Sequence, residues 1–169
     1  MKFTRKKLHY DDQLIQLIER YQNDFYRLAY SYTKNEQDAL DVVQDSIQKA
    51  MQSYEKLIEK EKLKSWFYKI VVHTSLDFLR KHKRVQVMED EQLQANQRNF
   101  HDAYENVDLE HALDDLPTIY REVVILRFFE DLKIEDIAFI LEENTNTIKT
   151  RLYKALRLLR ADLKTEEEF

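Results

Sequence analysis

The fold is decided near the C-terminus by the stretch from Leu132 to Arg160, which reads LKIEDIAFILEENTNTIKTRLYKALRLLR. Apolar residues recur there at helical spacing in two groups, which predicts two helices separated by a polar break. Asn144 or Thr145 offers a side-chain oxygen that can cap the second helix. From Thr145 to Ala161 there are five basic residues and no acidic residue, and the basic residues fall largely outside the apolar stripe. The pattern predicts a helix with one face in a core and a cationic face suited to a DNA groove.

The composition of the 169-residue chain favours helices throughout. The chain has no Gly and one Pro, so hairpins would lack their usual turn residues and Gly-rich phosphate loops are excluded. It has no Cys, which excludes disulfides and thiolate metal sites. No run approaches the roughly 20 apolar residues of a membrane span, and the N-terminus lacks the apolar core of a signal peptide. We therefore expect an all-α cytoplasmic protein without direct membrane insertion.

The formal net charge of −5 is distributed unevenly along the chain. Residues 62–84 carry seven Lys or Arg residues against one acidic residue. Residues 85–116 carry nine acidic residues against one basic residue. Because a polyanion responds to the local field, the negative total does not exclude a nucleic-acid partner.

Two helical bundles are predicted on either side of an acidic linker. Helices are expected from Asp11 or Asp12 to Thr33, after a cap at Asn35, and from about Leu63 to Lys83, which makes a first bundle at residues 1–84. Residues 85–108 are rich in Gln, Asn, Glu and Asp and are expected to form a flexible linker. The second bundle is expected at residues 109–169, and its core is expected to include Val123, Val124, Leu126, Phe128 and Phe129.

Nothing in the sequence predicts catalysis. The His residues, at positions 9, 73, 82, 101 and 111, include no pair at metal-ligand spacing. The carboxylates lie on polar helix faces, where solvation is the ordinary explanation. We therefore expect a protein that is not an enzyme, with no catalytic residue, no metal site and no cofactor.

The basic stretch from Lys62 to Arg84 interleaves charge with aromatic rings, a mixture that can hold a nucleic-acid backbone and stack bases. Helical spacing favours a core position for Trp66, Phe67 and Phe78. It leaves Tyr68 and His73 as candidates for the surface. The basic run at residues 80–84 can bind phosphates of any sequence.

A second candidate surface is acidic. Glu36, Asp38, Asp41 and Asp45 share one face of a predicted helix, where a solvated face is the ordinary explanation. Leu40, Val42 and Gln44 interrupt the acids, so one apolar edge has no obvious partner in its own bundle. The combination suits docking onto a basic helix of another protein.

Taken together, these stretches resemble the bacterial sigma factors. Residues 38–50 (DALDVVQDSIQKA) and 64–81 (KSWFYKIVVHTSLDFLRK) are similar to their regions 2.2 to 2.4. Residues 113–132 (LDDLPTIYREVVILRFFEDL) resemble region 4.1, and residues 133–160 resemble region 4.2. The short chain, without a region 3 between the halves, resembles the extracytoplasmic-function (ECF) subgroup. The resemblance identifies the two predicted bundles with sigma region 2 and with the helix–turn–helix domain of sigma region 4.

The resemblance implies a role in transcription initiation under stress or envelope-signal control. Such proteins bind core RNA polymerase, direct it to promoter DNA and help to open the duplex, and an anti-sigma factor is a usual partner. By motif position, the resemblance implies polymerase contacts at Asp38, Asp41, Val42, Gln44 and Asp45. It implies contacts with the −10 element at His73, Thr74, Arg80, Lys81, Lys83 and Arg84. It implies contacts with the −35 element at Lys149, Thr150, Arg151, Tyr153, Lys154 and Arg157.

Two departures from the family pattern carry expectations of their own. Glu142 and Glu143 stand where the family turn often has Gly and an apolar residue. A residue other than Gly in a left-handed turn costs about 1 kcal/mol, so this turn is expected to be strained or rearranged. His73 stands where Asn is frequent, which bears on the base preference at the −10 element.

Two other functions are compatible with parts of the pattern. A helix–turn–helix regulator that works without polymerase would explain residues 109–169, but it would leave residues 36–50 and 64–84 without a role. A helical adaptor protein would use its basic faces to meet acidic proteins. The adaptor predicts no preference for promoter DNA.

Overall fold

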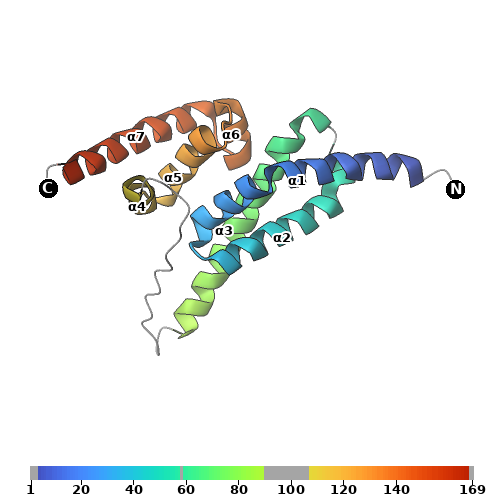
Figure 1. Cartoon of the computed structure of the whole chain (residues 1–169), viewed down its shortest axis with the longest axis horizontal. Helices are drawn as coiled ribbons and strands as arrows, with labels where there is room; N and C mark the ends of the chain where they lie inside the picture. Colours follow the sequence, from blue (N-terminus) through green and yellow to red (C-terminus); the bar gives the residue numbers. More distant parts are fainter. Residues whose placement is uncertain (1–3, 58, 90–106, 168–169) are drawn as a thin grey trace. The chain divides into compact units, whose positions relative to one another are not determined.

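The structure is a computed structural model that describes residues 4–57, 59–89 and 107–167 (Figure 1). Within these ranges every regular element is helical and no strand is present, which confirms the all-α prediction. The chain divides into two compact units, residues 1–83 and residues 84–169. Each unit is described by itself.

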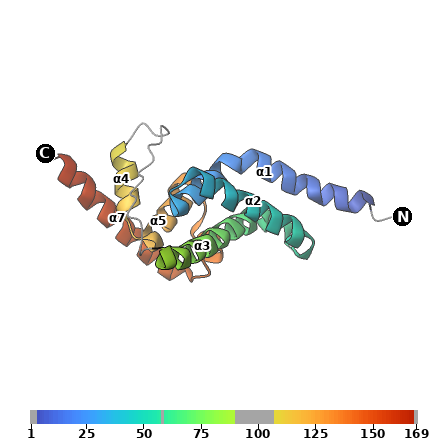
Figure 2. The same ribbon diagram turned by 90° about the horizontal axis from the view of Figure 1, so that it is seen from below.

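The first unit is built on three long helices, α1 (Thr4–Thr33), α2 (Glu36–Ser53) and α3 (Leu63–Glu89). Helices α1 and α2 lie side by side in both views of the ribbon (Figures 1 and 2). Two short 3₁₀ turns, η1 (Tyr54–Lys56) and η2 (Lys60–Lys62), lead from α2 into α3. The connection between α1 and α2 is tight because Lys34 takes a left-handed conformation with φ of 57°. The Asn35 side chain then accepts a hydrogen bond of 3.0 Å from the Asp38 amide, which confirms the predicted cap.

Aromatic side chains join α1 to α3. The Phe25 ring lies 4.4 Å from the Phe67 ring and 5.0 Å from the Tyr68 ring, between ring centroids. All three side chains are fully buried. The prediction that Tyr68 lies at the surface is therefore wrong. Tyr68 is rotated by only about 100° from Phe67 on α3, and α1 covers both positions.

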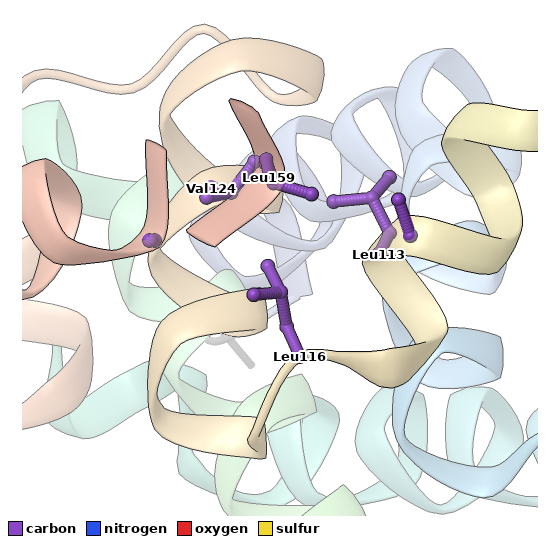
Figure 3. Packing of buried hydrophobic residues seen from close by; sticks show 6 residues of the cluster. Leu113, Leu116, Val124 and Leu159 are labelled. Atoms are coloured by element: carbon purple, nitrogen blue, oxygen red, sulfur yellow. The ribbon is translucent and has the colours of Figure 1, made fainter. Parts of the chain in front are cut away.

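The second unit contains α4 (Val107–Asp115), α5 (Thr118–Val124), η3 (Ile125–Phe129), α6 (Ile134–Leu141) and α7 (Thr145–Glu167). Its core brings the apolar faces of α4, α5 and α7 together, and Figure 3 shows Leu113, Leu116, Val124 and Leu159 pointing toward one another. Ala112 and Ala155 complete this buried cluster. The core holds α7 along one side only, so the opposite side of that helix faces away from it.

A π-helical turn, η3, interrupts the path from α5 to α6. The Glu130 amide donates to the Ile125 carbonyl over 3.0 Å, a bond between residues five apart rather than four. A turn closed by residues five apart contains one residue more than an α-helical turn, and this shifts the register of the apolar stripe. As a result, 56% of Phe128 is exposed. The predicted core position of Phe128 is therefore wrong, whereas Val123, Val124 and Leu126 are buried as predicted.

The predicted linker is helical at both of its edges. Helix α3 continues to Glu89, beyond the predicted bundle end at Arg84, and α4 begins at Val107. The remainder of the predicted linker, residues 90–106, lies outside the described residues. The functional division into residues 1–84, 85–108 and 109–169 stays a prediction.

Candidate nucleic-acid interface

The turn between α6 and α7 sets the direction of the cationic helix. Glu142 is left-handed, with φ of 55° and ψ of 41°. The Glu143 amide donates to the Ala138 carbonyl over 3.0 Å, and the Glu142 amide donates to the Phe139 carbonyl over 3.4 Å. These two bonds around a left-handed residue form a Schellman motif. The turn is therefore the ordinary one for ending a helix. Glu142 adopts there a left-handed backbone conformation that favours Gly.

A side-chain cap starts α7 directly after this turn. The Asn144 Oδ1 atom accepts a hydrogen bond of 2.8 Å from the Thr147 amide, so Asn144, rather than Thr145, supplies the predicted capping oxygen. Ile148, Ala155 and Leu159 are buried. They anchor the helix, and its orientation within the second unit follows from this stripe.

The exposed side of α7 carries most of the residues predicted to contact the −35 element. Five of the six are exposed: Lys149, Thr150, Tyr153, Lys154 and Arg157. Tyr153 is 70% exposed, which is unusual for an aromatic residue and leaves its ring outside the core. The Lys154 ammonium lies 5.2 Å from the centre of the Tyr120 ring on α5, within the range of a cation–π interaction. The helix thus presents cations, a hydroxyl and a ring on one face.

Arg151 is placed differently from the other five. Its Nη2 atom lies 2.8 Å from the Glu143 Oε1 atom, and 20% of its side chain is exposed. At about 100° per residue it lies about 60° from the buried Ile148, at the border of the exposed face. The structure therefore gives Arg151 a protein partner.

The residues predicted to contact the −10 element lie on α3. His73, Arg80 and Arg84 fall within about 40° of one another around the helix, and so form one stripe. Arg80 makes an ion pair of 3.4 Å with Asp77, in which both side chains are more than half exposed. Lys81 and Lys83 are exposed on either side of the stripe.

Thr74 does not belong to this surface. It is 4% exposed, and its Oγ1 atom accepts a hydrogen bond of 3.2 Å from the Lys49 ammonium on α2. The prediction of a DNA contact at Thr74 is corrected because the side chain faces the interior of the first unit. His73, its neighbour, is half-buried and keeps part of its ring at the surface.

The acidic face lies on α2. Asp41, Gln44 and Asp45 are exposed, and Asp38 is half-buried next to the helix start. The Gln37 Nε2 atom donates to the Asp41 Oδ1 atom over 3.2 Å. Val42 is 1% exposed and packs on the buried side with Ala39, Val43 and Ser46, so the prediction that it contacts a partner is corrected.

Other exposed apolar side chains extend this face. Leu40 is 47% exposed and Met51 is 42% exposed, both on α2. The sequence pattern indicates an exposed Leu40, whereas Met51 was not predicted. The sequence does contain a signal for Met51. It follows Leu40 by eleven residues, which are about three helical turns, so both side chains lie on nearly the same side of α2.

The described ranges contain neither a metal cluster nor a membrane-spanning helix. Among residues 4–57, 59–89 and 107–167 there is no group of three or more His, Cys, Asp or Glu side chains that could hold a metal ion. None of the helices described is long and apolar enough to cross a membrane.

Two sequence-family models match the chain. Sigma-70 region 2 matches residues 17–85, and sigma-70 region 4 matches residues 106–159. RNA polymerase sigma factor SigV of Bacillus subtilis (strain 168) is 54% identical over 154 residues, which cover 91% of this chain and 93% of that protein. The ECF RNA polymerase sigma-E factor of Haemophilus influenzae is 30% identical over 159 residues, which cover 85% of this chain and 83% of that protein.

A solved structure has the same fold. It is the sigma factor RpoE of Bartonella quintana in complex with the anti-sigma factor NepR, with a TM-score of 0.75 and 24% identity, over 92% of this chain and 97% of that one. The chain therefore belongs to the sigma-70 family, in its ECF group of RNA polymerase sigma factors. Both matched regions are those of transcription initiation factors, and neither is a catalytic family.

Proposed function

We propose that this chain binds core RNA polymerase in the cytoplasm and directs it to promoters through two DNA-contacting helices, α3 and α7. The observation that carries the proposal is the exposed face of α7. Lys149, Thr150, Tyr153, Lys154 and Arg157 are exposed on a helix whose opposite side is anchored in a core. A helix held in this way can enter a major groove without disturbing its packing.

The −35 element is the proposed target of α7. Lys side chains can donate to guanine edges, and the Thr150 hydroxyl can contact a phosphate or a base. The Thr150 Oγ1 atom donates to the Asn146 carbonyl over 2.9 Å, so the hydroxyl oxygen retains the capacity to accept. Tyr153 supplies the large exposed apolar surface that a thymine methyl group can contact.

The −10 element is the proposed target of α3. His73, Arg80 and Arg84 form a stripe along the helix, and Lys81 and Lys83 widen its positive field. His82 stacks on Phe78 with ring centroids 4.4 Å apart, so an aromatic surface adjoins the basic run. Cations beside rings hold a single strand through its phosphates and bases.

Core RNA polymerase is the proposed partner of α2. Asp38, Asp41, Gln44 and Asp45 offer acceptors, and the exposed Leu40 and Met51 offer apolar area beside them. An acidic rim around aliphatic side chains matches a basic amphipathic helix of a coiled coil. We further propose an anti-sigma factor as a regulatory partner, which responds to stress or to an envelope signal.

Run-off transcription tests the proposal. Core polymerase supplemented with this protein is expected to yield transcripts that start at discrete promoters. A regulator that works without polymerase would bind the same DNA without adding transcripts. An adaptor would also add no transcripts, so the assay separates the proposed function from both alternatives.

A binding titration tests the role of α7. Replacement of Lys149 and Lys154 by Ala is expected to reduce the slope of log affinity against log salt by about 0.9 for each phosphate that is no longer neutralised. An unchanged slope would place the DNA-binding surface elsewhere on the chain. Paired replacement of Lys56 and Lys133, which are also exposed, is the matched control and should leave the slope as in the wild type.

A further inference from the structure

The ion pair between Glu143 and Arg151 joins the turn that precedes α7 to the second turn of that helix. Glu143 precedes the cap of α7 by one residue, and Arg151 lies two turns into that helix. Their side chains meet at 2.8 Å between the Glu143 Oε1 atom and the Arg151 Nη2 atom. The Arg151 side chain is therefore directed toward the N-terminal end of α7.

The burial of the two partners makes this contact more than a loose surface pair. The Arg151 side chain is 20% exposed and the Glu143 side chain is 36% exposed. The Glu143 carboxylate also lies beside the N-terminus of α7, where a helix favours negative charge. Both effects favour a carboxylate held beside Arg151.

Arg151 differs in this respect from its neighbour Lys154. The Lys154 ammonium rests 5.2 Å from the neutral ring of Tyr120. A neutral ring does not cancel the positive charge of Lys154, whereas the carboxylate of Glu143 compensates the charge of Arg151. The positive charges of Lys154 and Arg151 are therefore not equally available to the phosphates of DNA.

We propose that Glu143 is a positioning residue that holds Arg151 away from the DNA phosphates and so limits the sequence-independent affinity of α7. This inference rests on the proposed function of α7 as a DNA-binding helix. Non-specific binding comes from neutralised phosphates, and each additional Arg–phosphate contact strengthens it at every site in a genome. Because Glu143 keeps Arg151 from neutralising a phosphate, it weakens the binding of α7 to DNA that is not a promoter.

The test measures binding of the full chain to a fluorescein-labelled duplex of random sequence by anisotropy, across a range of KCl concentrations. Glu143→Gln removes the charge and keeps the shape, which releases Arg151. The slope of log affinity against log salt is expected to steepen by about 0.9, the value of one phosphate. Arg151→Gln alone should leave the wild-type slope unchanged, and the double variant should also have the wild-type slope.

Glu135→Gln is the matched control, because it removes one exposed acid from α6 of the same unit. It is expected to leave the slope unchanged, and an equal steepening would show that general charge removal is sufficient and would overturn the proposal. A slope lowered by about 0.9 in Arg151→Gln would show that Arg151 already binds a phosphate, and would overturn it too. The slope of Arg151→Gln still tests the proposal if circular dichroism shows that Glu143→Gln is unfolded.

Failure of the proposed function has a different signature. If the double Lys149→Ala, Lys154→Ala variant keeps the wild-type slope, α7 is not the DNA-binding helix and both proposals fall. If that variant has a lower slope while Glu143→Gln matches the wild type, only the role of Glu143 is overturned.

Discussion

Lys49 on α2 donates a hydrogen bond of 3.2 Å to the Thr74 hydroxyl on α3. This bond joins the helix proposed to face polymerase to the helix proposed to face the −10 element. Because Thr74 is buried, its hydroxyl serves the packing of the first unit. It is not available to a base.

Replacement of Thr74 by Val should therefore affect stability more than promoter opening. We expect the free energy of unfolding to fall by about 1 kcal/mol, the usual net value of one hydrogen bond. Urea unfolding measures this change, and run-off transcription should give wild-type start sites and yields. His73→Ala is the comparison, since its ring is partly at the surface and its removal should lower the yield. Absence of open complexes with a folded Thr74→Val variant would restore Thr74 as a DNA-binding residue.

Charge reversal on α2 should separate polymerase binding from folding. Asp41→Lys combined with Asp45→Lys is expected to abolish association with core polymerase in a pull-down assay, because both carboxylates are exposed on the proposed docking face. The helical circular-dichroism signal should remain. Reversal of the exposed α1 acids Asp12 and Glu19 changes the net charge equally and should preserve association. Retained association in the α2 variant would exclude that face.

The first unit should fold without the second. A fragment that ends at Glu89 keeps all of α3 and the aromatic cluster of Phe25, Phe67 and Tyr68. We expect it to unfold cooperatively in urea and to bind core polymerase. A fragment that ends at Phe78 removes the basic run and serves as the matched shorter version. A non-cooperative transition in the fragment ending at Glu89 would contradict independent folding.

The left-handed residue that ends α6 should be open to improvement. Glu142→Gly removes the Cβ atom that disfavours φ of 55°, and we expect the free energy of unfolding to rise by about 1 kcal/mol. Glu142→Ala keeps a Cβ atom and removes the carboxylate, so it should give no gain. Urea unfolding of the two variants isolates the backbone effect. Equal stabilisation by both would assign the gain to removal of the charge.

Helical periodicity was sufficient to predict the all-α fold and several local features. Apolar spacing placed Phe67 and Ile148 in cores, and local capping chemistry placed Asn35 at the start of α2. These features depend on residues within one or two turns of each other, which the sequence displays directly. The end of α3 was not predicted because the helix continues into polar residues that have no apolar stripe.

Errors occurred where a second helix decides the exposure of a residue. Tyr68 and Thr74 lie off the main apolar stripe of α3, yet α1 and α2 cover them. Val42 interrupts an acidic run in the sequence but faces the core side of α2. The π-helical turn rotated Phe128 outward through a bond that no spacing rule anticipates.

The sequence by itself determined the helical class, the segregation of charge and the cationic side of α7, because these properties follow from residue type and a period of about 3.6 residues. Its order of motifs also indicated the sigma family. Only the tertiary structure decided that one cation of that helix, Arg151, is paired with a carboxylate. Glu143 and Arg151 are eight residues apart, and they meet although Glu143 lies in the turn that precedes α7 and Arg151 lies within that helix. This pairing depends on the path of the backbone between the end of α6 and the start of α7, which helical periodicity does not predict.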